Sequence, residues 1–402
     1  MNFAAVFEAL AKDAPPDCRG CIVSANDEKP LTIGLLRERL PGERRVALTP
    51  SDIGRLAKRA TFLVEREAGS EAGFSDAEYA TAGARVTNME EVLAQARLIV
   101  KIRPPHRSLL LRPGTLLVSL GGRDEALASL LREKSVVHLG LERLPRSTRA
   151  QSMDVLSSQA SIAGYAAVLE GARQLDVSLP MFITAAGTIK PARMMALGAG
   201  VAGLQAIATA RRLGAIAHGF DVRHAAREQV RSLGATFIAS EVSGISREAA
   251  GGYAGEQSAD EQLRLRRALA THIASMRLII ATAQIPGRPA PILIDEETVA
   301  AMQPGSVIVD LAAESGGNCT LTRPDELSTV HGVRIFGPTN LPSAVATNAS
   351  QLFGGNIRAF LDYLIRSDGQ LNLDREDPIT GALLANQLPA LTPALVAKDT
   401  FR

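Results

Sequence analysis

The sequence predicts an α/β protein built from two doubly wound, parallel-sheet domains. The chain has 402 residues, a length that fits two or three domains. Short β-rich runs alternate with helical stretches along most of it. This alternation is typical of parallel sheets that are covered by helices on both faces. Near the middle of the chain, the glycine-rich stretch "LGAGVAGLQ" separates a strand-like run from a helix-like one.

The composition fits a folded protein with a large core. Hydrophobic residues make up 46% of the chain and charged residues 21%, which excludes global disorder. The net charge is +2, with no Lys/Arg block and no Trp, so we expect no nucleic acid partner. Because no long apolar run or basic leader occurs, we expect a soluble, cytoplasmic chain without a membrane span. Cys18 and Cys21 form a lone CxxC without a second ligand pair, so we expect no metal site.

Residues 1–29 are predicted to form an N-terminal arm, and the first domain follows from residue 30 to residue 155. Its stretch "TPSDIGRLAKR" predicts a helix with Thr49 or Ser51 as the N-cap, because apolar residues recur there at helical spacing. Five β-rich runs predict its strands: "LTIGLLRE", "TFLVER", "LIVKIR", "GTLLVSL" and "SVVHLGL".

A long helix over 158–175 is predicted to bridge to the second domain, which spans 156–340. Helix formers dominate this segment and no Pro interrupts it. The second domain has seven candidate strands: "MFIT", "RMMALG", "AIAHGF", "ATFIA", "LIIATA", "SVIVDLA" and "VRIFG". After residue 340 the chain turns helical, so we assign 341–402 to the first domain.

The glycine-rich turn matches the pattern GxGxxG. In such a loop the first glycine permits a tight turn, the second lets the backbone approach a pyrophosphate, and the third allows close packing of helix and strand. The helix that follows offers free N–H groups to the phosphates. The predicted cofactor-binding residues of the loop are Gly198, Ala199, Gly200, Val201, Ala202 and Gly203.

An aspartate ends the next strand, close to the expected offset of about 20 residues. Asp221 can accept hydrogen bonds from the adenosine ribose hydroxyls and repel a 2′-phosphate, which favours NAD over NADP. Val222 and Arg223 follow directly and join the predicted site, although Arg223 and Arg227 weaken the exclusion of NADP slightly. The sequence therefore predicts a Rossmann-like domain that binds NAD(H) directly.

Several long motifs identify a family. The stretches "RAQSMDVLSSQASIAGY", "TAAGTIKPARMMALGAGVAGLQAIATARRLGA", "IIATAQIPGRPAPILI" and "GSVIVDLAAESGGNC" resemble the NAD(H)-binding alpha subunit of proton-translocating NAD(P) transhydrogenase. The resemblance covers roughly residues 31–390. The stretch "ERRVALTP" is shared with the wider group that includes alanine dehydrogenase.

This resemblance implies a function and a set of partners. It implies NAD(H) in a cleft between the two α/β domains and direct hydride transfer between NADH and NADP⁺. The NADP(H) would be held on a partner subunit, and a separate membrane proton-channel subunit would couple the transfer to proton translocation. The resemblance also implies a homodimer that is peripheral to the inner (cytoplasmic) membrane through its partner subunits.

The family carries a polar loop on the nicotinamide side, and "PRSTRAQSMDVLS" supplies it here. The resemblance implies that Arg146 pairs with the pyrophosphate or the reacting ribose, and that Gln151 reaches toward the second nucleotide. It implies that Asp154 and Ser157 fix the carboxamide of the ring. The alternative is a polar loop that only leads into the bridging helix.

Other candidate residues carry open alternatives. Tyr253 in "GGYAGE" corresponds to the tyrosine of a mobile loop in the family, or is a packed surface residue. Asp310 ends an apolar strand, where it could contact the cofactor or cap the next turn. Three positions depart from the family pattern, which leaves loop behaviour and contacts at the cleft in question: Gly255, Gln284 (also a predicted cofactor contact) and Ala344.

Two other functions stay open. An alanine dehydrogenase needs a cation clamp for a carboxylate and an acid/base group. Arg103 stands where that family has a lysine, no His occupies the second position in "LLVSLGG", and Arg45 remains. These differences favour a transhydrogenase, since hydride transfer between nicotinamides needs no proton donor. A non-catalytic NAD-binding subunit is the other alternative.

Overall fold

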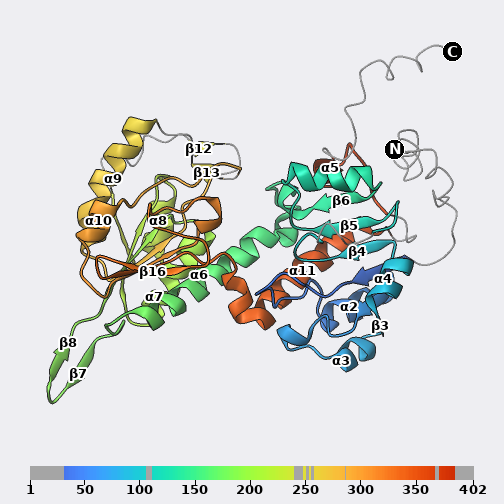
Figure 1. Ribbon diagram of the computed structural model, residues 1–402, viewed down its shortest axis with the longest axis horizontal. Coiled ribbons are helices and arrows are strands. Elements are labelled where there is room, and N and C mark those ends of the chain that lie inside the picture. The colour runs from blue at the N-terminus through green and yellow to red at the C-terminus, as the bar shows by residue number, and fades with distance from the viewer. Residues whose placement is uncertain are drawn as a thin grey trace, which may run out of the picture. The chain divides into compact units, whose positions relative to one another are not determined.

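The structure, a computed structural model, describes residues 31–105, 111–239, 258–285, 287–366 and 371–384, with the short strands β12 (Glu248–Ala249) and β13 (Tyr253–Ala254). The chain forms two compact units. Unit 1 comprises the described residues up to Ser158 and from Ala346 onward, and unit 2 comprises Gln159–Val345. In each unit, helices flank a central sheet (Figure 1).

Unit 1 is built on a six-stranded, all-parallel sheet in the order β3-β2-β1-β4-β5-β6. Because strand order reverses beside β1, the carboxyl ends of β1 and β4 flank a switch point, where α/β sheets usually bind ligands. The strands are β1 (Thr32–Leu35), β2 (Thr61–Glu65), β3 (Arg85–Thr87), β4 (Leu98–Val100), β5 (Leu116–Ser119) and β6 (Val137–Gly140).

The helices of unit 1 include the long helix α11 (Ala346–Leu364), which follows unit 2 along the chain. Phe353, Ile357 and Phe360 of α11 belong to the same buried core as Ile33 and Val64 of the central strands. The unit's helices are α2 (Pro50–Leu56), α3 (Asp76–Thr81), α4 (Met89–Gln95), α5 (Glu125–Glu133), η2 (Ser70–Ala72), η3 (Leu141–Arg143), η4 (Gln151–Met153), α11 (Ala346–Leu364) and α12 (Thr380–Leu384).

Unit 2 has a seven-stranded sheet in the order β11-β10-β9-β14-β15-β17-β16, parallel except for the edge strand β16. Successive residues of β9 face opposite layers: Met194 and Ala196 pack in one buried cluster, Met195 and Leu197 in another. The sheet strands are β9 (Arg193–Leu197), β10 (Ile216–Phe220), β11 (Thr236–Phe237), β14 (Leu278–Ala281), β15 (Val307–Asp310), β16 (Leu327–Val330) and β17 (Val333–Phe336).

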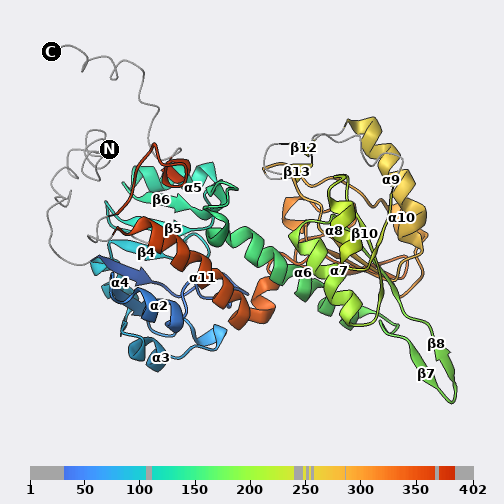
Figure 2. The same cartoon turned by 180° about the vertical axis from the view of Figure 1, so that it is seen from behind.

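Helices cover both faces of this sheet, as Figures 1 and 2 show from opposite sides. Val168 and Ile207 belong to the cluster on one face, and Leu265 and Val299 to the cluster on the other. The doubly wound α/β class predicted from the sequence is therefore confirmed. The helices are α6 (Val155–Gln174), which begins in unit 1, α7 (Val201–Arg212), α8 (Ala226–Ser232), α9 (Ala259–Ala274), α10 (Glu296–Ala300), η5 (Ala313–Ser315) and η6 (Leu341–Val345).

Some elements differ from the prediction. The run "MFIT" is a strand, but β7 (Phe182–Thr184) pairs with β8 (Gly187–Ile189) in a separate hairpin that projects from unit 2 (Figure 1). The strands β3 and β16 were not expected. Both lie at sheet edges, where half-buried positions weaken the apolar signal. The predicted N-terminal arm, with Cys18 and Cys21, and also Gly255, lie outside the described residues.

Candidate functional site

The glycine loop connects β9 to α7, and two of its glycines are required by packing. Gly198 has φ +96°, and a Cβ there would lie 2.7 Å from Thr282 Oγ1. A Cβ on Gly203 would collide with the carbonyl oxygen of Gly198. Larger residues at these two positions would therefore force strand and helix apart.

Gly200 is different, because neither packing nor conformation requires it. Its φ is −78°, which any residue can adopt, and no described atom lies within 4 Å of a Cβ built there. A side chain at this position would point into open space beside the loop. The residues present therefore fit a dinucleotide, whose pyrophosphate needs this approach to the backbone.

The N-terminus of α7 is also suited to phosphate. Within the described residues, no side chain caps this 12-residue helix, whose N-cap is Gly200. Its first-turn N–H groups, at Val201, Ala202 and Gly203, carry the positive end of the helix dipole. Gly164 of α6 lets α7 pack closely against α6, because a Cβ at this position would collide with the carbonyl oxygen of Ala202.

Asp221 follows β10 and is bound to the glycine loop. Its Oδ2 accepts a hydrogen bond from the backbone N–H of Ala199 at 2.8 Å. The Arg223 guanidinium donates to both carboxylate oxygens, from Nε to Oδ1 at 3.0 Å and from Nη2 to Oδ2 at 2.9 Å. The Arg223 backbone N–H adds a fourth bond at 2.8 Å. The structure thus brings Asp221 and Arg223 together at the glycine loop, as a strand end and the following turn.

The loops after β14 and β15 are joined by a buried asparagine. Asn318 Nδ2 donates to the carbonyl oxygens of Ala283 and Pro291, both at 2.8 Å, and its Oδ1 accepts from the Ala283 N–H at 3.0 Å. Gln284 is exposed and donates to the Leu311 carbonyl oxygen at 2.8 Å. These contacts fix the shape of the carboxyl edge of the sheet beside the glycine loop.

Asp310 organises the second of these loops. Its carboxylate is fully buried and accepts four hydrogen bonds, from the N–H groups of Ala312, Asn318 and Cys319 and from Thr322 Oγ1. Burial raises the pKa of the Asp310 carboxyl, while the hydrogen bonds oppose that rise. These bonds match the capping alternative, and contact with the cofactor stays a prediction.

In unit 1, Asp154 and Ser157 form a pair at the start of α6. Asp154 Oδ1 accepts from the Ser157 N–H at 2.9 Å, and Oδ2 accepts from Ser157 Oγ at 2.6 Å. Two of roughly four acceptor positions on the carboxylate stay open, and Ser157 Oγ can still accept. The pair therefore caps the helix and also presents acceptors that would suit the NH₂ of a carboxamide.

The remaining predicted residues are less defined by contacts. Arg146 is exposed in the loop before η4, and Gln151 is exposed as the first residue of η4. Tyr253 lies in β13, which pairs with β12, and its side chain is outside the described portion of the chain. Ala344 is exposed in η6. Roles for these residues stay predictions.

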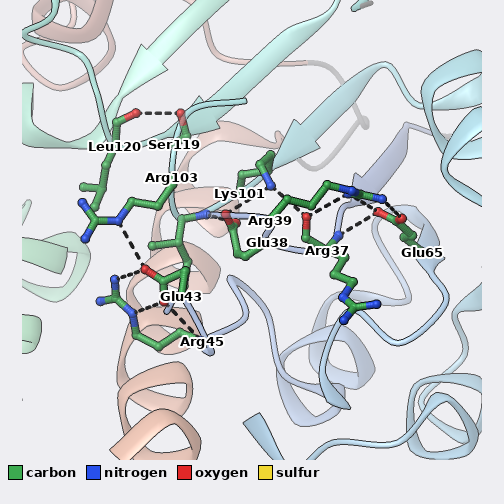
Figure 3. A network of polar contacts seen from close by, with 11 residues as sticks. Arg37, Glu38, Arg39, Glu43, Arg45, Glu65, Lys101, Arg103, Ser119 and Leu120 are labelled. Carbon is green, nitrogen blue, oxygen red and sulfur yellow. Dashed lines mark hydrogen bonds and ion pairs between the residues drawn. The ribbon is translucent and has the colours of Figure 1, made fainter. Parts of the chain in front are cut away.

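A buried charge network lies after β1 and β4 in unit 1 (Figure 3). Glu43 is central to it, since its carboxylate pairs with Arg45 at 2.6 Å and with Arg103 at 3.2 Å. Nearby, Glu38 pairs with Lys101 at 3.1 Å, and burial raises the pKa of the Glu38 carboxyl although Lys101 opposes it. The two arginines that a carboxylate substrate would need are therefore already bound to a carboxylate of the chain.

A histidine lies on the neighbouring strands, and the sequence did not predict it at this position. His138 of β6 has its Nε2 3.0 Å from Ser119 Oγ of β5, and Ser119 donates to the Leu120 carbonyl oxygen at 2.8 Å. Burial lowers the pKa of the His138 imidazole, which favours its neutral form.

Comparisons with known proteins agree with this architecture. Residues 34–163 match the family model described as "Alanine dehydrogenase/PNT, N-terminal domain", and residues 167–388 match "Alanine dehydrogenase/PNT, C-terminal domain". The chain is 40% identical to the first of the polypeptides that make up NAD(P) transhydrogenase subunit alpha in Rhodospirillum rubrum, over 92% of this chain and 100% of that one.

Two solved structures are also similar. A transhydrogenase from Sinorhizobium meliloti superposes with a TM-score of 0.79 at 40% identity, over 87% of this chain and 97% of the other. An L-alanine dehydrogenase superposes with a TM-score of 0.69 at 26% identity, over 83% and 90%.

The fold and the glycine loop therefore define a nucleotide-dependent oxidoreductase, and the chain belongs to the alanine dehydrogenase/PNT family. Within that family it belongs with the alpha subunits of NAD(P) transhydrogenase. Among the described residues, no helix has both the length and the apolar character needed to cross a membrane.

Several residues of the site lie in stretches that carry the family resemblance but were not predicted as site residues. Thr282, Asn318 and Gly164 contact the loops or helix of the site from far along the chain. Thr282 directly follows the end of β14, whereas Asn318 lies beyond η5 in the loop after β15. Glu43 lies two residues before Arg45, but the sequence did not show that its carboxylate would pair with both Arg45 and Arg103.

Proposed function

We propose that this chain binds NAD(H) at the glycine loop of unit 2 and exchanges hydride directly with NADP(H) held on a partner subunit. The observation that carries the proposal is the open space beside Gly200, at an uncapped helix N-terminus and next to Asp221. The pyrophosphate would lie against Gly200 and α7, and Asp221 would take the adenosine ribose.

The nicotinamide supplies the hydride when NADH is bound, so the chain's own residues have to position the ring. Asp154 and Ser157 would hold the carboxamide NH₂ through their free acceptor positions. Arg146 would pair with the pyrophosphate or the ribose, and Gln151 would reach toward the second nucleotide. Tyr253 would close over the bound nucleotide. Gln284 and Asp310 would shape the edge beside it.

The charge network of unit 1 supports a transhydrogenase over an amino-acid dehydrogenase. Glu43 pairs with both Arg45 and Arg103, so a substrate carboxylate would have to compete with Glu43 for these guanidinium groups. His138 is buried, and its Nε2 lies 3.0 Å from Ser119 Oγ of the chain itself. Hydride exchange between two nicotinamides needs neither a carboxylate clamp nor a proton donor, only alignment and exclusion of water.

The proposal includes partners. The relatives are named as subunits, which supports partner subunits for this chain. We propose that these partners are an NADP(H)-binding subunit and a membrane proton-channel subunit. Coupling to proton translocation would pass through the membrane subunit, and the chain would be peripheral to the membrane on the cytoplasmic side. We also propose a homodimer.

Nucleotide binding is tested by placing a methyl group where the pyrophosphate would lie. Gly200→Ala should still fold, because nothing described contacts the new Cβ and φ is permissive. The dissociation constant for NADH should rise at least about tenfold, measured by fluorescence titration. Gly355→Ala in α11 is the matched control, since a Cβ there also meets open space. Unchanged NADH affinity in Gly200→Ala would contradict the proposed site.

Hydride exchange is tested in a mixture with the NADP(H)-binding domain of a relative, NADPH and an NAD analogue of distinct absorbance. Asp154→Ala should slow reduction of the analogue at least about tenfold, because the carboxamide loses its acceptor. Asp124→Ala, which removes the capping aspartate of α5, controls for the loss of a helix cap. No transfer by the unsubstituted chain, despite NADH binding, would favour a dehydrogenase or a non-catalytic subunit.

A further inference from the structure

The carboxylate of Asp221 has no acceptor position left for a ligand. A carboxylate offers roughly four lone-pair positions. Oδ1 accepts from the Arg223 N–H and Nε, and Oδ2 accepts from the Ala199 N–H and Arg223 Nη2. A ribose hydroxyl can therefore bind Asp221 only if one of these donors leaves.

The four donors differ in how easily they can leave. Two are backbone N–H groups, fixed by the turn after β10 and by the glycine loop. The other two belong to the Arg223 guanidinium, whose side chain is 23% exposed while that of Asp221 is only 8% exposed. Rotation of one side chain frees both oxygens, so the guanidinium is the group that a ribose would displace.

The displaced guanidinium cannot travel far. The Arg223 backbone stays tied to Asp221, and its Nη2 already lies 3.4 Å from the carbonyl oxygen of Ala199 in the glycine loop. The freed cation therefore stays beside the ribose. A guanidinium suits a phosphate well, because its parallel N–H groups can bind two phosphate oxygens at once.

We propose that Arg223 is a displaceable latch on Asp221 and sets how strongly the site discriminates against a 2′-phosphate. With any nucleotide, the latch competes with the ribose hydroxyls for the carboxylate. With a 2′-phosphorylated nucleotide, the released guanidinium partly compensates by pairing with the phosphate. The inference rests on the proposed function and deepens it, because it names the residue that tunes nucleotide choice at that site.

The test compares 5′-AMP with 2′,5′-ADP, two probes that differ only in the 2′-phosphate. In Arg223→Ala, 5′-AMP should bind at least as tightly as in the unsubstituted chain, since the competitor is gone. The ratio of dissociation constants, 2′,5′-ADP over 5′-AMP, should rise at least about threefold, because the phosphate then meets Asp221 without a counter-ion. Titration calorimetry gives both constants.

Controls separate this inference from general effects of charge and folding. Arg231→Ala removes the same charge at the far end of α8 and should leave the ratio unchanged. Arg223→Gln is the second variant if the alanine variant does not fold. The proposed role of Arg223 would be overturned if the ratio rose less than about threefold, or if both variants bound 5′-AMP more weakly. If the unsubstituted chain binds neither 5′-AMP nor NADH, the proposed function fails instead.

Discussion

At the scale of single residues, two buried polar side chains of unit 2 are held by hydrogen bonds within the chain. Asp310 accepts four hydrogen bonds and Asn318 makes three. Sequence could predict that Asp310 lies at a strand end, because an apolar run precedes it. It could not predict which distant donors would meet that carboxylate, since the donors come from a loop whose path the tertiary fold decides.

His138 gives the protein a pH-dependent stability. Burial lowers the pKa of His138, so the unfolded chain binds a proton on this side chain more readily than the folded chain does. The free energy of unfolding should therefore fall as pH drops through about 6.5, the ordinary pKa of histidine, and level off below the folded pKa. In His138→Gln the decline should be shallower, as measured by urea denaturation at about pH 7.5 and about pH 5.5. His218, whose pKa burial also lowers, provides a remaining slope in both proteins.

At the scale of elements, local capping decides where helices begin. Thr49 and Ser51 were both candidates for the N-cap of α2, and the structure assigns Thr49. Thr49 Oγ1 accepts from the Asp52 N–H at 3.4 Å, and Asp52 accepts from the Thr49 N–H at 3.1 Å, which completes a capping box. Ser51 is exposed in the first turn.

Thr49→Ala should lower the free energy of unfolding by about 1 kcal/mol, because the Asp52 N–H loses its side-chain acceptor and the Asp52 carboxylate loses the Thr49 hydroxyl donor. Ser51→Ala should change it by less than about 0.5 kcal/mol, as is usual for exposed positions. Urea denaturation of the two variants measures both. Equal losses in the two variants would contradict the assignment of the N-cap.

The elements also show how far sequence reasoning reaches. The strand, glycine loop and helix at 193–212 were predicted because their signals are local: an apolar run, fixed glycine spacing and uninterrupted helix formers. The hairpin of β7 and β8 was misplaced because "MFIT" has the apolar content of a buried strand, yet both strands are exposed throughout. Whether an apolar segment joins the buried sheet or stays exposed depends on tertiary contacts, which the local sequence pattern does not encode.

At the scale of the whole molecule, this hairpin is the most exposed apolar element among the described residues. Ile183 is 73% exposed, and Met181, Phe182 and Ile189 are about half exposed. Contiguous apolar side chains of this kind usually mark an interaction site. The hairpin is therefore our candidate contact for the proposed homodimer.

Ile183→Asp should shift the protein from dimer toward monomer, because dimerisation would then bury an unpaired charge. Sedimentation equilibrium at several concentrations measures the shift. Leu327→Asp, which also replaces an exposed apolar residue of unit 2, should leave the dimer intact. A monomeric unsubstituted chain would contradict the homodimer, and an unaffected dimer would exclude the hairpin as its contact.

The order of the units along the chain has a consequence for synthesis. The core of unit 1 includes Phe353, Phe360 and Leu364 of α11, which the ribosome makes only after all of unit 2. Unit 2 is continuous from Gln159 to Val345 and has all its strands once that segment has emerged. The segment of unit 1 that is translated first therefore completes its core only after unit 2 has been made, so its apolar strands lack the cover of α11 during that time.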